Sequence, residues 1–102
     1  MFTLMAQIMA QNEYIQTLTT QADHLEIEFA IGRLEGLFQQ LRVINPTNFR
    51  LAFAWAMLDQ YTRNGLNQLR LSVVNEDKEC LEDTFMSLQE NISYTVALLS
   101  WV

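Results

Sequence analysis

The chain has few of the residues that end or cross-link secondary structure. Its 102 residues include one proline, three glycines and one cysteine. So little turn chemistry argues against a fold of many short strands and favours a few long helices. The single cysteine, Cys80, excludes an intramolecular disulfide and a cysteine-rich zinc site. The fold therefore does not depend on an oxidising compartment, and we expect a cytoplasmic protein.

Positive charge is scarce. Charged residues make up 18% of the chain, six of them are basic, and the formal net charge is −6. Lys78 is the only lysine, and the arginines are dispersed along the sequence. Nucleic-acid binding requires clustered cations that replace phosphate counterions. We therefore expect no direct binding of DNA or RNA.

Long hydrophobic runs are also missing. The start, MFTLMAQIMAQNEY, lacks a basic segment, and Gln7 and Gln11 interrupt its apolar residues. This pattern predicts an amphipathic helix and not a signal peptide. The longest strongly apolar run, near the C-terminus, is about half of the roughly 20 residues that a membrane span requires. We predict no membrane span.

What the chain does have is helical periodicity, clearest in its last third. Apolar or small residues follow one another at steps of four and three, as in a heptad repeat: Leu81, Phe85, Leu88, Ile92, Thr95, Leu99 and Val102. Residues 94–102 are apolar on nearly every face, so one neighbouring helix cannot cover them. Such a helix either lies inside the chain's own bundle or contacts another chain. We predict a partner or self-association face made of Leu81, Phe85, Leu88, Ile92, Leu99 and Trp101.

The first forty residues carry two apolar patterns of the same kind. The first pattern is Leu4, Ile8, Gln11, Ile15, Leu18, Ala22, Leu25 and Phe29, and the second is Ile27, Ile31, Leu34, Phe38 and Leu41. The offset of two residues between them rotates the apolar face and predicts a break near residues 19–23. Asp23 and Glu26 there resemble a capping box. One continuous bent helix is the alternative, because the segment lacks glycine and proline.

Further boundaries follow from Pro46 and Gly65. Proline disfavours helix at Asn45, and Thr47 or Asn48 can cap the next helix. Residues 49–58 are apolar almost all round, as in a helix in the middle of a bundle. Gly65 predicts the end of this helix, because glycine readily takes the left-handed conformation of a C-cap. For residues 66–74 we favour a short helix or connector over a strand, since a single strand has no partner.

Together these patterns predict an all-α fold. We expect a single domain over residues 1–102, a small antiparallel bundle completed by dimerisation. Its four principal helices lie near residues 2–19, 23–43, 48–63 and 77–101. Gly32 and Gly36 form a pair of small residues inside the second helix, where glycine costs roughly 1 kcal/mol relative to alanine. The pair predicts close approach of another helix, inside the bundle or at a subunit contact.

Five carboxylates gather within eight residues at the predicted start of the last helix: Glu76, Asp77, Glu79, Glu82 and Asp83. Carboxylates interact favourably with the partial positive charge of a helix N-terminus, which explains the cluster without a ligand. The alternative is contact with a basic partner surface. The run lacks the alternating acids and glycine of a calcium loop.

No arrangement of residues indicates catalysis or metal binding. His24 and Glu28 are one helical turn apart, with Glu35 two turns further on, but one histidine does not supply a metal site. Cys80 has no neighbouring base, and the sequence has neither a serine elbow nor a phosphate-binding glycine loop. We predict no enzymatic activity, no cofactor and no metal.

The function that we predict is a non-enzymatic protein–protein interaction module: an adaptor, assembly chaperone or inhibitor that binds a protein partner through apolar helix faces and forms a homodimer. Met5 and Met9 should stay accessible for contact, since methionine adapts to varied partner surfaces. Two alternatives remain at this point. One is a structural subunit that becomes ordered within a larger complex, and the other is an acidic decoy that blocks a basic, nucleic-acid-binding surface.

Overall fold

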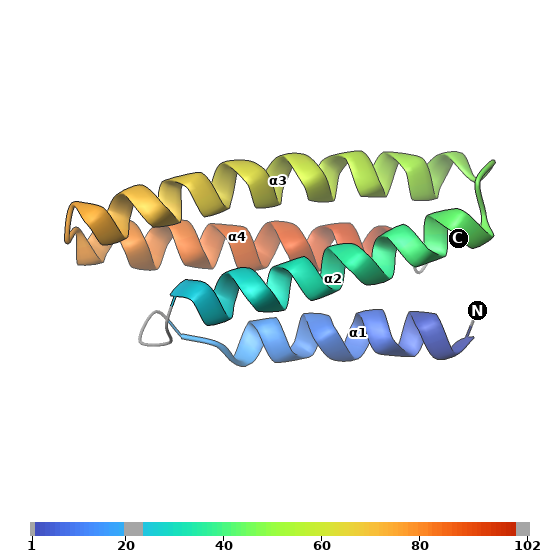
Figure 1. Ribbon diagram of the computed structural model, residues 1–102, viewed down its shortest axis with the longest axis horizontal. Coiled ribbons are helices and arrows are strands. Elements are labelled where there is room, and N and C mark those ends of the chain that lie inside the picture. Colours follow the sequence, from blue (N-terminus) through green and yellow to red (C-terminus); the bar gives the residue numbers. More distant parts are fainter. Residues whose placement is uncertain (1, 20–23, 100–102) are drawn as a thin grey trace.

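The computed structural model describes residues 2–19 and 24–99, which form four helices. They are α1 (Phe2–Thr17), α2 (His24–Ile44), α3 (Phe49–Val74) and α4 (Lys78–Leu99). The helices run alternately in opposite directions (Figure 1), and the described residues include no strand. The predicted all-α bundle of four helices is confirmed.

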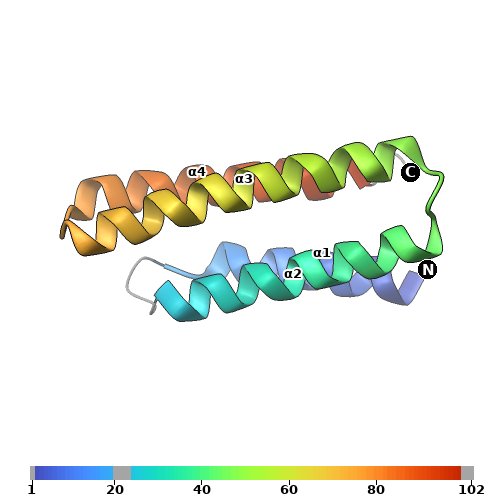
Figure 2. The same ribbon diagram turned by 45° about the horizontal axis from the view of Figure 1, so that its top comes forward.

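The helices pack as a closed ring. Each helix contacts the next one along the chain, α1 also contacts α4, and within the described bundle the backbones of the diagonal pairs, α1 with α3 and α2 with α4, do not approach closely. Figure 2 shows α3 and α4 as one pair and α1 and α2 as the other. The most extensive contact is between α3 and α4, and the least extensive is between α1 and α4. The core therefore lies between two helical pairs, and the contact within the α3–α4 pair is more extensive than that within the α1–α2 pair.

Heptad-spaced residues of all four helices fill this core. In α1 and α2 the buried side chains include Leu4, Ile8, Ile15, Ile27, Ile31, Leu34, Phe38 and Leu41, and in α3 and α4 they include Leu51, Leu58, Leu69, Phe85, Leu88, Ile92 and Leu99. Two buried threonines also face inward, and both satisfy their hydroxyl groups within their own helix. Thr62 donates to Leu58 O at 2.8 Å and Thr95 donates to Asn91 O at 2.8 Å.

The break predicted near residues 19–23 is present. α1 ends at Thr17 and α2 begins at His24, so the two are separate helices. The capping residue proposed at Asp23 lies outside the described residues. Leu25 and Phe29, which continue the first apolar pattern, are exposed, whereas Ile27 of the second pattern is buried. The change of pattern thus marks a real rotation of the buried face.

The boundary at Pro46 is also confirmed. α2 ends at Ile44, and the Asn48 side chain accepts a hydrogen bond from Leu51 N at 3.1 Å, which caps α3. Arg42 near the end of α2 packs over the Trp55 ring of α3, 5.5 Å from its centroid. The Arg42 side chain thus covers part of Trp55, which belongs to the apolar run of residues 49–58.

The C-cap predicted at Gly65 is wrong. α3 continues through this residue to Val74, so residues 66–74 are part of a long helix and are neither strand nor connector. Gly65 makes room for α4, because a Cβ atom there would lie 2.6 Å from Leu88 Cδ1. The helix ends instead at Val74 with Asn75 as its C-cap, and Glu76 follows in a left-handed conformation with φ of 55°.

Amide side chains hold α1 in place. Gln89 of α4 donates from Nε2 to Ile15 O at 2.8 Å and to Leu18 O at 3.2 Å. Gln16 returns a bond from its Nε2 to Gln89 O at 3.0 Å. Gln11, the polar member of the first apolar pattern, donates to Ala30 O of α2 at 2.9 Å. The carbonyls at the end of α1 thus find partners that the helix itself cannot supply.

Candidate interaction surfaces

The predicted association face of the last helix lies mostly inside the bundle. Phe85, Leu88, Ile92 and Leu99 are buried against the other helices of the same chain, and Leu81 is half-buried. Trp101 lies outside the described residues. The described part of this heptad pattern therefore packs mainly into the chain's own core. More exposed apolar surfaces lie elsewhere on the molecule.

The two methionines of α1 differ in exposure. Met5 is half-buried and packs against the core, whereas the Met9 side chain is 54% exposed. Met9 therefore remains available to a partner, and Met5 contributes to the stability of the bundle.

The acidic cluster surrounds the turn between α3 and α4. Glu76, Asp77, Glu79, Glu82 and Asp83 are all exposed. Asp77 Oδ1 accepts a hydrogen bond from Cys80 N at 3.1 Å and so caps α4. Glu79 lies in the first turn of the same helix, where a negative charge is favourable. The structure thus accounts for two of the carboxylates, while Glu82 and Asp83 project from α4 into solvent.

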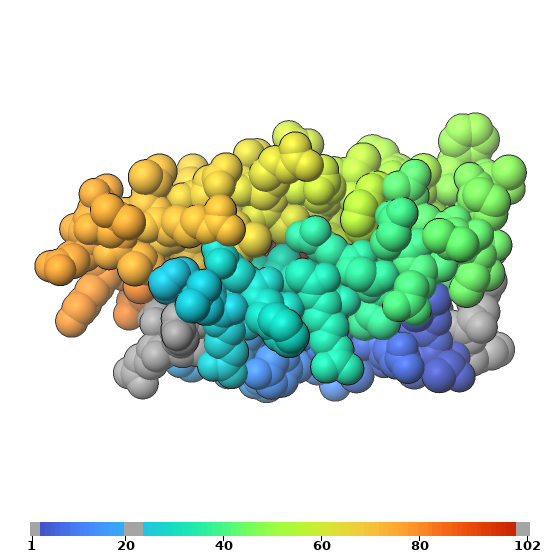
Figure 3. All heavy atoms as spheres, viewed as in Figure 1, coloured from blue at the N-terminus to red at the C-terminus, as the bar shows by residue number. Residues whose placement is uncertain are grey.

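A cluster of exposed apolar side chains lies at the opposite end of the bundle, around the turn between α2 and α3. We call it the turn surface, and it consists of Val43, Ile44, Phe49 and Phe53. Phe49 is 90% exposed and Phe53 is 60% exposed. Figure 3 shows this end in green, at the right, with side chains that stand out from the body of the molecule.

Sequence reasoning missed the turn surface because residues 49–58 look apolar on every side. The buried members of this segment are Leu51, Ala54 and Leu58. Phe49 and Phe53 each lie two residues from Leu51, which is a rotation of about 200° around a helix axis. The three-and-four spacing of the buried residues is the signal that could have separated the two phenylalanines from the core.

A second exposed surface runs along α2. We call it the outer seam, and it consists of Leu25, Phe29, Gly32 and Gly36. Leu25 is 61% exposed and Phe29 is 76% exposed. A Cβ atom added to Gly32 or Gly36 would meet nothing within 4 Å. Of the two predicted alternatives, close approach by a neighbouring helix of the bundle is therefore wrong, and the subunit contact stays a prediction.

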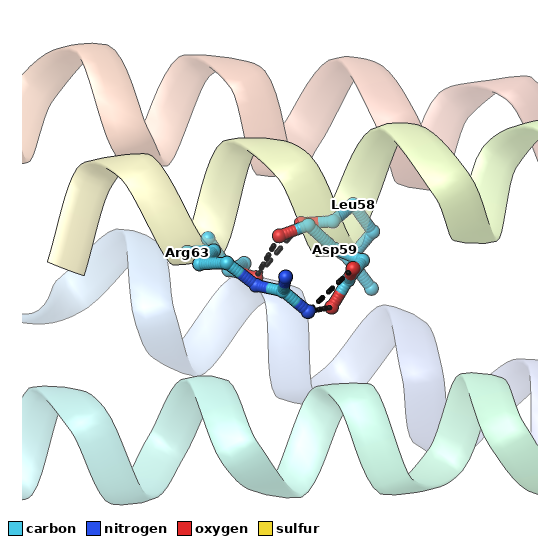
Figure 4. A network of polar contacts seen from close by, with 4 residues as sticks. Leu58, Asp59 and Arg63 are labelled. Carbon is cyan, nitrogen blue, oxygen red and sulfur yellow. Dashed lines mark hydrogen bonds and ion pairs between the residues drawn. The ribbon is translucent and has the colours of Figure 1, made fainter. Parts of the chain in front are cut away.

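The groove between α2 and α3 is polar and balanced in charge. Glu35, Asp59, Arg63 and Arg70 line it. Arg63 Nη2 binds Asp59 Oδ2 at 3.0 Å within α3 (Figure 4), and Arg70 pairs with Glu28 of α2. Because each of these arginines is paired with a carboxylate, the groove does not present a concentrated charge to a ligand.

Two further polar contacts bear on chemistry. The Ser72 hydroxyl donates to Cys80 Sγ at 3.2 Å. Among the described residues, no group of three or more metal-ligating side chains lies together. The Tyr14 hydroxyl donates to Glu26 Oε1 at 3.0 Å, and this bond together with the carboxylate charge raises the pKa of Tyr14 above its ordinary value. Tyr14 therefore stays protonated and anchors α1 to α2.

None of the helices within residues 2–19 and 24–99 combines the length and apolar character that crossing a bilayer would need. The chain matches no family model, and neither a curated protein nor a solved structure shows significant similarity to it.

Proposed function

We propose that this protein is a non-enzymatic interaction module, an adaptor, assembly chaperone or inhibitor, that binds a protein partner through the turn surface. The observation that carries the proposal is the exposure of two phenylalanines one helical turn apart, 90% for Phe49 and 60% for Phe53. Single exposed apolar residues are ordinary, but clustered ones usually mark a contact with another molecule.

Aromatic side chains are well suited to this role. They bury a large area with few rotatable bonds and are enriched among the residues that dominate binding energy. Trp55 lies in the same segment but packs under Arg42, so it serves the contact between α2 and α3. Phe49 and Phe53 have no comparable role in the fold, since both lie on the side of α3 away from its buried residues. With no disulfide to form, we place this activity in the cytoplasm.

The test compares the full chain with Phe49→Ser/Phe53→Ser and with a control, Gln60→Ser, which alters an exposed residue further along the same side of α3. Each chain is immobilised and exposed to an extract of the source cells, and captured proteins are quantified. A candidate partner is then purified, and its Kd is measured by calorimetry for all three chains.

We expect the double variant to keep its folding stability within about 0.5 kcal/mol, because surface substitutions rarely change it more. It should lose a partner that the original chain and the Gln60 variant both bind. A partner that binds all three chains with equal Kd would refute the turn surface as its binding site.

The acidic decoy is a second candidate, favoured by the exposure of Glu79, Glu82 and Asp83 at the other end of the bundle. A decoy holds its partner by charge, so neutralising these three residues and raising the salt concentration should each weaken binding. Retention of the partner in both experiments would eliminate this candidate.

A further inference from the structure

The outer seam lies directly opposite the core side of α2. Each of its members is two residues from a buried one: Leu25 and Phe29 flank Ile27, and Gly32 and Gly36 flank Leu34. Two residues correspond to a rotation of about 200°. The seam therefore points straight out of the bundle, with its bulky residues in one half and its glycines in the other. Val43 of the turn surface lies on the same side of α2, about two turns beyond Gly36.

Nothing within the described part of the chain uses the space that the two glycines leave. Glycine inside a helix is unfavourable relative to alanine. Both positions are exposed, and an added Cβ atom would touch no other group. Glycine at such positions allows the backbone of another helix to approach closely.

We propose that the occupant of the outer seam is the same helix of a second copy of this chain, packed antiparallel. In an antiparallel heptad pair, residues face each other when their numbers add to a constant. With a sum of 61, Phe29 faces the partner's Gly32, and Leu25 faces the partner's Gly36. Each bulky side chain then fills the space above a glycine, four times in the symmetric dimer. A parallel pair would instead set Phe29 against Phe29 and leave the glycines facing each other.

Charge on one flank favours the same register. Flanking residues meet slightly off the level at which the numbers add to 61, so on the flank towards α1 Glu26 comes nearest to the partner's Arg33, with a sum of 59. Two-fold symmetry repeats this pair. Both residues are exposed. On the flank towards α3, Glu28 comes opposite the partner's Glu35. That repulsion is reduced within each chain, because Arg70 pairs with Glu28 and lines the same groove as Glu35.

The first test is the mass of the full chain by light scattering after size exclusion, over a dilution series. We expect a dimer of twice the 11.9 kDa chain mass that dissociates on dilution. Phe29→Ser should raise the dimer Kd more than about a hundredfold, since two buried phenylalanines are lost. Leu71→Ser removes an exposed apolar side chain of α3 that belongs to neither surface and should change Kd by less than about threefold.

The second test is a charge exchange on the flank towards α1. Glu26→Arg and Arg33→Glu should each raise the dimer Kd about tenfold, because each sets like charges opposite each other twice. The double variant should return Kd to within about threefold of the original. Circular dichroism checks that each variant remains helical, which matters for Glu26 because it also accepts the bond from Tyr14.

Three results would overturn the proposal. They are a monomer at every concentration up to about 1 mM, far above the Kd of a specific dimer, a dimer that tolerates Phe29→Ser, and a double variant as weak as the single charge reversals. None of them bears on the turn surface, because partner binding there is measured with Phe29 and Glu26 intact.

Discussion

Gly65 and the pair Gly32 and Gly36 all lie inside long helices, yet they meet opposite surroundings. At Gly65 an added Cβ atom would come within 2.6 Å of Leu88 Cδ1, whereas at Gly32 and Gly36 it would meet open space. Gly65 lets α4 pack closely against α3 and so serves the fold. The other two serve no contact within the described chain. A glycine inside a helix is therefore evidence for close packing of a neighbouring helix only where the structure shows that helix beside it.

The heptad patterns of α4 and of the outer seam also look alike in sequence but differ in their surroundings. Both step by four and three, and both combine bulky and small residues. Phe85 and Leu88 are buried within the chain, whereas Leu25 and Phe29 point to solvent. The spacing specifies which residues share a face of a helix. It does not specify whether the face is covered by the same chain.

The largest expected effect is at Gly65. Gly65→Leu places a side chain where Leu88 lies and should lower the free energy of unfolding by about 3 kcal/mol, the upper part of the range for overpacked cores. Urea denaturation measures the loss. Adding Leu88→Ala should recover part of it by removing the clash. A variant as stable as the original chain would mean that α3 and α4 separate easily at this point.

A second comparison concerns two glutamines. Gln89 donates to two carbonyls at the end of α1, while Gln39 is exposed on α2. Gln89→Ala should lower the free energy of unfolding by about 1–2 kcal/mol, since two hydrogen bonds are lost. Gln39→Ala should change it by less than about 0.5 kcal/mol. Hydrogen exchange should show the effect of Gln89→Ala first in the amides of α1, and equal exchange in both variants would contradict it.

Two carboxylates of the acidic cluster differ in the same way. Asp77 caps α4, so Asp77→Ala should lower the free energy of unfolding by about 1 kcal/mol. Glu82 projects from α4, and Glu82→Gln should change it by less than about 0.5 kcal/mol. Thermal unfolding of both variants measures the difference. If the two substitutions were equally harmful, the cap would not explain the position of Asp77.

The smallest expected effect has the opposite sign. Gly32→Ala should raise the free energy of unfolding of the monomer by about 0.5–1 kcal/mol, because alanine favours helix and the position is open. Unfolding has to be followed at a concentration at which the chain is monomeric. A loss of stability there would show that the space above Gly32 is used within the chain.

Much of the fold follows from the sequence by direct physical argument. The offset between the apolar patterns placed the break before α2, and Pro46 with Asn48 placed the start of α3. The C-cap predicted at Gly65 was wrong because glycine is common both at helix ends and at close contacts between helices. Only the position of Leu88 distinguishes the two cases here. The exposed phenylalanines were hidden for a related reason, since an apolar run does not reveal which of its sides the core occupies.

The link between Gln89 and the end of α1 has a consequence for the order of folding. Its hydrogen bonds join residues 74 and 71 positions apart in the chain. The contacts of α1 with α2, α2 with α3, and α3 with α4 each join neighbours in sequence, so they can form as the chain is synthesised. The ring closes only when α4 is present, and until then the carbonyls of Ile15 and Leu18 lack their bonds from Gln89. Closure of the bundle is thus a late event that couples the first helix to the last.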